Sequence, residues 1–292
     1  MKSLKQIYLS LFLALALLLC GCTTPDETVS DASDANSSEE RVAYTLEVLT
    51  EGGMPLAGVR VEVYSDNTGN SRLFARETDE NGKLTFEALR SVELTAALSN
   101  LPAGLQTEQR FAITETTQIV LKASFEDGSD LSAFTMKLGS IARDCTVTAT
   151  DGTEYRFSEL LQTKKAIVLN FWFIGCGPCR AEFPHLQSAY DAYSEDVEVL
   201  AINPYDGTNA SVAAYASEMG LTFPMIAGDA AWQSCMRLTA YPTTVVIDRY
   251  GMICMLFQGS ITEEGVFERI FEHFSQNDYQ QQIFRNPIDL LG

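Results

Sequence analysis

Alternating apolar and polar residues dominate the part of the chain that follows residue 40. Apolar side chains recur at every second position in short runs, and stretches rich in Gly, Asn and Pro separate these runs. The runs cover residues 42–48, 59–63, 84–86, 92–96, 111–113 and 119–121. Roughly seven short strands at this spacing predict an all-β sandwich over residues 41–124.

After residue 124 the pattern changes to strands that alternate with helices. Residues 145–157 predict a hairpin around Asp151-Gly152, and the almost continuously apolar residues 166–173 are typical of a strand covered on both faces. Further strands are predicted at 197–202, 243–247 and 252–257, and helices at 210–219, at 229–238 and from Thr262 onward. We therefore expect an α/β domain with a mixed sheet over residues 125–275, and then a tail, residues 276–292, whose docking the pattern does not specify.

Two cysteines lie where the buried strand of residues 166–173 gives way to a helix. They form the motif Cys176-Gly177-Pro178-Cys179, in which the glycine lets the backbone close a small disulfide ring. Unpaired N–H groups and the dipole at a helix N-terminus favour a thiolate, so we expect Cys176 to be exposed and reactive there. Cys179, one turn later, can attack a mixed disulfide formed by Cys176. The motif predicts thiol–disulfide exchange with protein dithiols or disulfides as partners.

Pairs of the type Cys-x-x-Cys also occur in zinc sites and in haem attachment motifs. Half a zinc site is disfavoured because neither a second such pair nor paired histidines follow, and Arg180 replaces the histidine of a haem motif. No metal and no cofactor are therefore expected. Two alternatives stay open: a peroxidase related to the peroxiredoxins, and a non-catalytic adhesion or assembly lipoprotein whose β-sandwich is the working part.

The first 22 residues have the layout of a bacterial export signal. Lys2 and Lys5 precede the apolar residues 9–19, and Leu19-Cys20-Gly21-Cys22 resembles the lipobox of bacterial lipoproteins, although Cys20 departs from it. The resemblance implies that residues 1–21 are a signal peptide and that Cys22 carries lipid, with an ordinary cleaved signal as the alternative. We expect an exported protein, anchored on the outer side of the bacterial cytoplasmic membrane or located in the periplasm or outer membrane.

An acidic segment follows the signal, and the whole chain is acidic. Residues 22–40 are rich in Asp, Glu, Ser and Thr and poor in apolar side chains, so we expect a disordered tether. The formal net charge of −19 argues against nucleic acid as a partner and against binding to an anionic membrane through basic patches. Lipid on Cys22 is then the expected contact with the membrane.

Two separate motifs resemble one family, the membrane-tethered thioredoxin-like oxidoreductases of the TlpA/ResA type. The first runs from Val168 through the cysteine pair to Pro184, and the second is Tyr241-Pro242-Thr243-Thr244-Val245-Val246-Ile247-Asp248. The likeness covers about residues 136–274. It implies a cis Pro242 that faces the cysteine pair, and a Tyr241 backbone that pairs with an extended segment of the substrate.

The same resemblance bears on single residues around the pair. Glu182 occupies the place of a carboxylate that assists proton transfer near the buried thiol; a glutamate that only complements the helix dipole is the alternative. Asn170 stands where thioredoxin has a buried aspartate. Trp172 is a candidate for substrate binding, with core packing as the other interpretation. Ile174-Gly175 replaces the usual aromatic residue before the first cysteine, which predicts a flatter and more open surface there.

Two further features lie outside the redox motif. Residues 54–63 and 78–86 resemble transthyretin-like and Cna-B-like sandwich modules, which implies a spacer or docking role for residues 41–124. Cys145, Cys235 and Cys254 are left over, and they form either one disulfide plus a free thiol or three buried thiols.

The sequence therefore predicts a tethered thiol–disulfide oxidoreductase. Gly and Pro between the cysteines match reducing thioredoxins, and TlpA/ResA relatives mostly reduce their clients, for instance apocytochrome c. We expect a reductase of exported or envelope proteins that receives electrons from a membrane protein. An oxidase or isomerase is the alternative, since a difference of about 30 mV changes the exchange equilibrium by about 1.4 kcal/mol.

Overall fold

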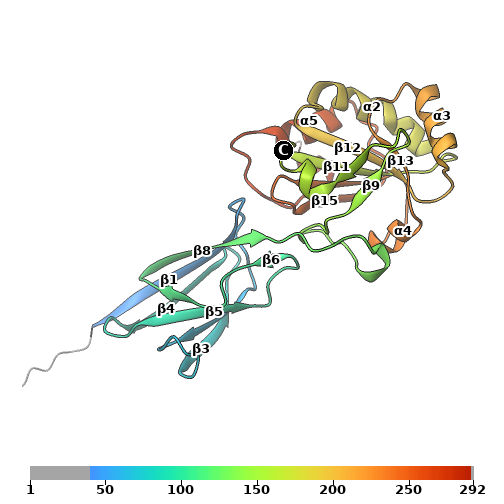
Figure 1. The fold of residues 1–292 in the computed structure, drawn as a ribbon. Helices are drawn as coiled ribbons and strands as arrows, with labels where there is room; N and C mark the ends of the chain where they lie inside the picture. Colours follow the sequence, from blue (N-terminus) through green and yellow to red (C-terminus); the bar gives the residue numbers. More distant parts are fainter. Residues whose placement is uncertain (1–39, 291–292) are drawn as a thin grey trace, which may run out of the picture. The chain divides into compact units, whose positions relative to one another are not determined.

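The computed structural model describes residues 40–290, which contain a β-only part and an α/β part (Figure 1). The predicted signal peptide, the predicted lipidation site Cys22 and nearly all of the predicted tether lie outside these residues. Within the described range, no helix is both long enough and apolar enough to cross a membrane.

Residues 41–123 form two four-stranded sheets, with the strand orders β4-β1-β8-β6 and β3-β2-β5-β7. Phe86 of one sheet packs edge-on against Phe74 of the other, with ring centroids 4.9 Å apart, so the sheets face each other across an apolar core. The strands are β1 (Arg41–Thr50), β2 (Arg60–Tyr64), β3 (Arg72–Glu77), β4 (Lys83–Leu89), β5 (Leu94–Ser99), β6 (Leu105–Gln106), β7 (Phe111–Ile113) and β8 (Thr116–Ala123). The predicted all-β sandwich is confirmed.

The α/β part is built on a five-stranded mixed sheet of order β13-β12-β11-β14-β15. The central strand β11 (Ala166–Phe171) runs parallel to β12 and antiparallel to β14. The other strands are β9 (Thr146–Thr148), β10 (Glu154–Arg156), β12 (Val197–Asn203), β13 (Met225–Ala227), β14 (Thr243–Asp248) and β15 (Ile253–Gln258). The helices are α1 (Phe157–Leu160), α2 (Gly177–Tyr193), α3 (Asn209–Met219), α4 (Ala231–Cys235) and α5 (Val266–Ser275), with short 3₁₀ turns at Leu131–Ala133 and Pro287–Leu290.

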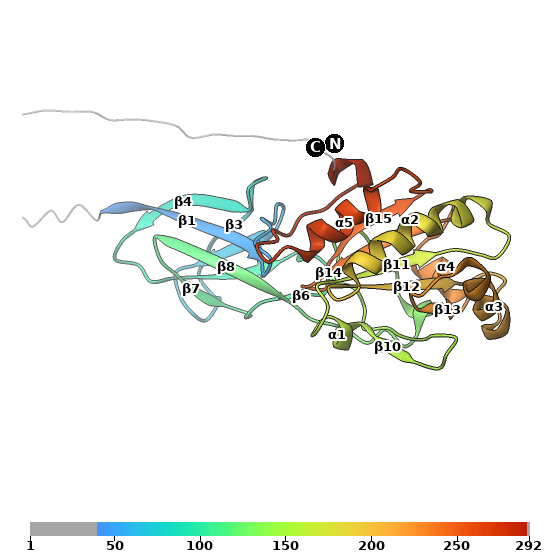
Figure 2. The same cartoon turned by 90° about the horizontal axis from the view of Figure 1, so that it is seen from above.

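Helices cover both faces of this mixed sheet. On one face α2 and α5 lie side by side (Figure 2), and their apolar side chains share one core with Val168 of β11. On the other face α4 places Trp232 against Phe157 of α1 and Phe171 of β11. Because both faces are covered, every residue of β11 is buried, which accounts for the nearly continuous apolar run in its sequence.

Two helix boundaries differ from the sequence prediction. The last helix, α5, begins at Val266 rather than near Thr262, because Gly265 at its N-cap adopts a φ of 78°. Helix α4 is shorter than the predicted 229–238, because Arg237 leaves the helical region with a φ of 50°.

The C-terminal tail is docked on the α/β part. The Phe284 N–H donates a hydrogen bond of 2.8 Å to the Cys254 carbonyl of β15. The Tyr279 hydroxyl and the Gln281 side-chain amide donate to Oδ2 of the buried Asp248, at 3.1 and 2.6 Å. The sequence pattern did not specify this docking, which depends on two side-chain hydrogen bonds and a backbone pairing rather than on a regular apolar period.

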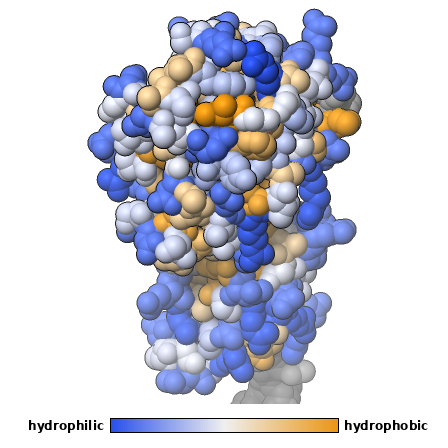
Figure 3. Space-filling view, turned by 90° about the vertical axis from the view of Figure 1, so that its right-hand side faces the viewer, coloured by the Kyte–Doolittle hydropathy of each residue, from blue (hydrophilic) through white to orange (hydrophobic). Residues whose placement is uncertain are grey.

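Hydrophilic residues cover most of the face shown in Figure 3, with smaller apolar areas between them. This is the surface expected of a strongly acidic chain. Among the described residues, Leu73, Tyr205 and Ile288 are large apolar or aromatic side chains that stay exposed.

Candidate redox site

The two motif cysteines form a disulfide at the start of α2. Cys176 and Cys179 are bonded, with their Cα atoms 5.3 Å apart. Cys176 is the N-cap residue of α2, and its sulfur accepts a hydrogen bond of 3.1 Å from the Cys179 N–H. Pro178 lies in the first turn, where its missing N–H leaves no intrahelical bond unmade. The motif therefore sits at the junction of strand and helix, as its sequence context predicts.

The two sulfur-bearing residues differ in their contact with solvent. Cys176 is 4% exposed and Cys179 is 0% exposed, so of this pair Cys176 is the one that a partner can reach. The expectation that Cys176 is freely exposed is wrong for this disulfide form. Gly175 itself is exposed, and the flatter, more open surface expected beside it stays a prediction.

A buried carboxyl group lies one helical turn beyond Cys179. Glu182 is fully buried, and its two oxygens accept hydrogen bonds from Asn170 Nδ2 at 2.7 Å and from the Ile261 N–H at 2.6 Å. Burial outweighs these two hydrogen bonds and raises the pKa of Glu182 to about 7. A carboxyl group with a pKa near neutrality can exchange a proton at physiological pH.

The second motif reaches the cysteine pair through the segment that follows β15. The Tyr241–Pro242 peptide bond is cis, as the family resemblance implies. The Pro242 carbonyl accepts a hydrogen bond of 2.9 Å from the Gly259 N–H, and the next residue, Ser260, donates from Oγ to the Pro178 carbonyl at 3.2 Å. The consecutive residues Gly259 and Ser260 thus connect the Tyr241-Pro242 motif to the cysteine motif.

Two aromatic residues that the sequence prediction did not include, Phe173 and Tyr205, follow the neighbouring strands β11 and β12. The Phe173 ring contacts Tyr241 and Tyr205, each with a centroid separation of 5.4 Å. Phe173 follows β11 and Tyr205 follows β12, and these strands are parallel neighbours. The carboxyl ends of parallel neighbours meet at one edge of a sheet, so a prediction that paired these two strands could have found Tyr205.

Trp172 belongs to the core of the α/β part. It is fully buried, and its ring packs against Phe183 at 5.4 Å and against Tyr215 at 4.8 Å. The expectation that Trp172 binds substrate is corrected by this burial, and the alternative of core packing agrees with the structure.

The three other cysteines of the described residues are buried thiols. Cys145, Cys235 and Cys254 are unpaired and buried, which agrees with the second of the two alternatives. Burial raises the pKa of all three thiols, to about 11 for Cys235. Across residues 40–290, no cluster of three or more His, Cys, Asp or Glu side chains is arranged to hold a metal ion.

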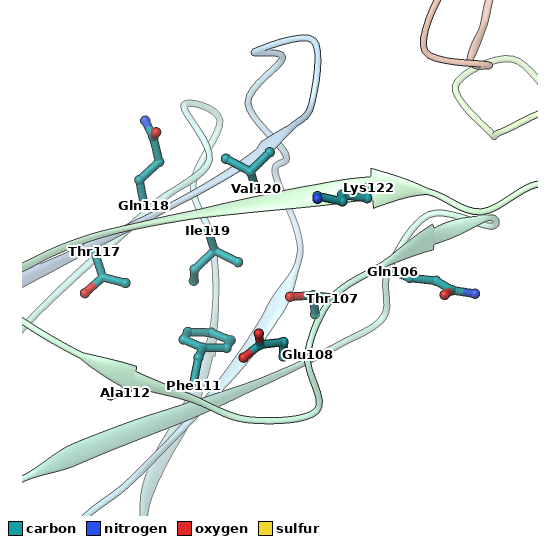
Figure 4. Close-up of a pocket in the computed structure, with 10 residues that line it drawn as sticks. All are labelled: Gln106, Thr107, Glu108, Phe111, Ala112, Thr117, Gln118, Ile119, Val120 and Lys122. Carbon is teal, nitrogen blue, oxygen red and sulfur yellow. The ribbon is translucent and has the colours of Figure 1, made fainter. Parts of the chain in front are cut away.

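A groove of about 650 Å³ lies in the β-only part (Figure 4). Side chains from β6, β7, β8 and the loop between β6 and β7 line it, and Ile119 and Phe111 point toward each other across it. None of its lining residues comes from the α/β part. The groove is therefore separate from the redox pair.

The position of the disulfide on this fold is that of a thioredoxin-like thiol–disulfide oxidoreductase, and comparisons with known proteins agree. Residues 138–255 match the AhpC/TSA family. The thiol-disulfide oxidoreductase ResA of Geobacillus kaustophilus (strain HTA426) is 31% identical over 172 residues, which cover 56% of this chain and 95% of that protein. ResA of Bacillus subtilis (strain 168) is 27% identical over 149 residues, covering 50% and 75%. The chain belongs to the ResA family of thiol-disulfide oxidoreductases.

Solved structures give related matches. A thiol:disulfide interchange protein of the thioredoxin family from Chlorobium tepidum TLS is 21% identical with a TM-score of 0.41, and the match covers 48% of this chain and 99% of that one. StoA from Bacillus subtilis is 23% identical with a TM-score of 0.38, covering 45% and 96%.

Proposed function

We propose that this protein is a membrane-tethered reductase of disulfides in exported or envelope proteins. One observation carries the proposal: the N-cap Cys176 touches solvent, whereas Cys179 is fully buried and is followed one turn later by the buried Glu182. A client disulfide can meet only the outer sulfur of such a pair. Cys179 then attacks the mixed disulfide and releases the client.

The exchange proceeds in two steps. In the reduced protein the Cys176 thiolate attacks one sulfur of the client disulfide; that S–S bond breaks, the other client sulfur leaves as a thiolate, and a Cys176–client disulfide forms. Cys179 then loses its proton and attacks Cys176 Sγ, which releases the second client sulfur. Two electrons pass from the pair to the client, and the pair ends as the disulfide found in this structure.

Glu182 is the proposed acceptor of the Cys179 proton. It lies three residues beyond Cys179 on the same helix, so both side chains share one face of α2. Its pKa of about 7 suits a group that takes up a proton and returns it at neutral pH. Asn170 supplies a hydrogen-bond donor to this carboxylate where thioredoxin has an acid.

The other parts of the chain complete the proposal. Residues 1–21 would direct export, lipid on Cys22 would anchor the protein, and the acidic residues 22–40 would act as the tether. Residues 41–124 would serve as a spacer or docking module of transthyretin-like or Cna-B-like type. A membrane protein would return two electrons to the disulfide, and apocytochrome c is one client class that the family resemblance suggests.

Trapping of clients tests the mechanism. Cys179→Ser should accumulate a mixed disulfide with client proteins, because the resolving thiol is gone, whereas Cys176→Ser should form none. A Cys176→Ser/Cys179→Ser double variant that folds and leaves the cellular phenotype unchanged would favour the adhesion alternative. Hydroperoxide turnover that survives in Cys179→Ser would favour the peroxidase.

The reduction potential tests the direction of electron flow. A reductase should have a potential near that of thioredoxin, about −270 mV, whereas a value near the DsbA value of about −120 mV would assign an oxidase. Equilibration of the Cys176/Cys179 couple with glutathione buffers measures it.

A further inference from the structure

The segment that carries Cys176 is held by few packing contacts. Glycines lie on both sides of this cysteine. Leaving aside adjoining residues and the helix backbone, a β-carbon on Gly175 would meet only the Phe173 ring, at 3.6 Å, and one on Gly177 would meet nothing within 4 Å. Glycine also leaves the backbone more conformational freedom than other residues do. Residues 174–176 therefore depend mainly on hydrogen bonds for their position.

One of these hydrogen bonds comes from a distant part of the chain. The Ile174 N–H donates to Asp206 Oδ1 at 3.0 Å. The other hydrogen bonds of residues 174–176 stay within residues 173–180: the Cys176 N–H donates to the Phe173 carbonyl, and the Cys176 carbonyl accepts from the Arg180 N–H, each at 3.1 Å. Within the described residues, Asp206 is thus the hydrogen-bond link between this segment and the loop that follows β12.

A buried amide places Asp206 for this contact. Asn203, the last residue of β12, is fully buried, and its Oδ1 accepts from the Tyr205 N–H at 3.0 Å and from the Asp206 N–H at 3.1 Å. Its Nδ2 donates to Asp206 Oδ1 at 2.9 Å. A β-carbon on Gly207 would lie 2.8 Å from Asn203 Nδ2, so a glycine there lets the loop close around the amide. The oxygen that faces Ile174 is therefore held by a buried side chain, although Asp206 itself is exposed.

The hydrogen bond to Asp206 has its largest effect when the Cys176–Cys179 bond is open. In the disulfide form, the bond itself limits the movement of Cys176. In the dithiol and in a mixed disulfide that limit is gone, and Asp206 still holds Ile174, two positions before Cys176. Closure of the disulfide depends on how often the two sulfurs meet, so a segment that is held in place closes to a greater extent.

We infer that Asp206 is a positioning residue of the redox reaction, whose hydrogen bond to Ile174 keeps Cys176 within reach of Cys179 and favours closure of the disulfide. The inference rests on the proposed function, because it concerns the second step of the exchange. In that step the Cys179 thiolate attacks Cys176 Sγ, the bond between Cys176 and the client sulfur breaks, and the client leaves as a thiolate. A pair that closes readily is a stronger reductant, which agrees with the proposed direction.

Equilibration with glutathione tests the inference. The reduced full-length chain, with C20S and C22S introduced, is mixed with glutathione and glutathione disulfide, quenched with acid and analysed by mass spectrometry. The same chain with Cys179→Ser gives the mixed-disulfide constant, for the bond between Cys176 and glutathione. The intact pair gives the overall constant, and the quotient of the two is the closure constant. The first constant reports the reactivity of Cys176, and the closure constant reports its position relative to Cys179.

Two substitutions of Asp206 separate its hydrogen bond from its charge. Asp206→Ala removes the acceptor and should lower the closure constant about threefold, with the mixed-disulfide constant unchanged. That change corresponds to a potential about 14 mV higher, since a tenfold change is about 30 mV. Asp206→Asn keeps an oxygen opposite the Ile174 N–H and should retain the wild-type closure constant. Asp206 Oδ2 accepts no hydrogen bond among the described residues, so the new amide nitrogen has no donor to face.

A control and a second measurement accompany these variants. Asp151→Ala is the matched control, because Asp151 is also exposed and accepts a backbone N–H, that of Thr153, at 2.9 Å in the turn between β9 and β10. It should leave both constants unchanged. Hydrogen exchange of the Ile174 N–H in the reduced protein should be faster in Asp206→Ala than in the wild-type protein and in Asp206→Asn.

The outcomes distinguish the inference from the proposed function. An unchanged closure constant in Asp206→Ala, an equal loss in Asp206→Asn, or an Ile174 N–H that exchanges at one rate in all three proteins would overturn the inference and leave the proposed function standing. Failure of the wild-type pair to close, or of its Cys179→Ser form to bond glutathione, would overturn the proposed function and the inference with it.

Discussion

Asn170 Nδ2 lies 2.7 Å from Glu182 Oε1, and both side chains are fully buried between the central strand and the helix of the redox pair. The amide is on β11 and the acid is on α2. The buried acid of this site therefore shares its helix with Cys179, and the strand contributes a neutral donor that stabilises the ionised form of that acid.

Glu182→Gln should flatten the dependence of stability on pH. The folded-state pKa of Glu182 is raised from 4.5 to about 7, so its contribution to stability is fully present below about pH 4.5 and is lost as the pH rises through 7. The full effect amounts to about 3 kcal/mol. Denaturant unfolding between pH 4 and 8 measures the slope. Glu218→Gln, at an exposed position of α3, is the control, and equal slopes in Glu182→Gln and the wild-type protein would contradict the prediction.

Asn170→Ala should raise the pKa of Glu182 further. The Asn170 hydrogen bond lowers this pKa, so its removal leaves burial less opposed. The midpoint of the Glu182 carboxyl titration, followed by ¹³C NMR, should move above 7, and the free energy of unfolding should fall by about 1–3 kcal/mol. A midpoint that stays in place would show that Asn170 does not influence the carboxyl group.

Thiol reactivity should separate the redox pair from the other cysteines. In a chain that lacks the two cysteines before residue 23, the oxidised protein should show no fast-reacting thiol, because Cys145, Cys235 and Cys254 are buried with raised pKa values. Mild reduction should expose Cys176 and Cys179 to the reagent. A fast thiol in the native oxidised protein would refute the prediction, and denaturation should reveal three thiols as the positive control.

Asp248→Asn should loosen the C-terminal tail. The new amide would face the Tyr279 hydroxyl and the Gln281 amide, which are both donors, so we expect a loss of about 3 kcal/mol in the free energy of unfolding. Trypsin should then cleave after Arg285 faster than in the wild-type protein. Asp278→Asn, at an exposed position of the same tail, should leave the cleavage rate unchanged; equal rates in all three proteins would argue against an anchoring role for Asp248.

The local pattern was enough to predict the strand and the cysteine pair. The apolar run that becomes β11 and the adjacent Cys-Gly-Pro-Cys motif are neighbours in the sequence, so their relationship needs no tertiary information. The sandwich was predictable for the same reason, because apolar residues recur at every second position along its strands. The cis Pro242 was not predictable from the residues themselves and followed from the family resemblance.

The surroundings of the pair depended on contacts between distant segments. Phe173 and Tyr205 meet because β11 and β12 are parallel neighbours, a pairing that no local pattern specifies. Trp172 is adjacent in sequence to that surface, yet Tyr215 of α3 covers it and makes it part of the core.

The pairing of Phe284 with β15 also bears on strand pairing between separate molecules of the protein. An outer strand with an unpaired row of N–H and C=O groups is a template for the strands of other molecules. Here Phe284 of the chain's own tail donates a hydrogen bond to the Cys254 carbonyl of β15. This stretch of the sheet edge is therefore closed to strand addition by another molecule. Where many copies of the protein lie close together, a sheet edge covered by the chain's own tail is a safeguard against aggregation.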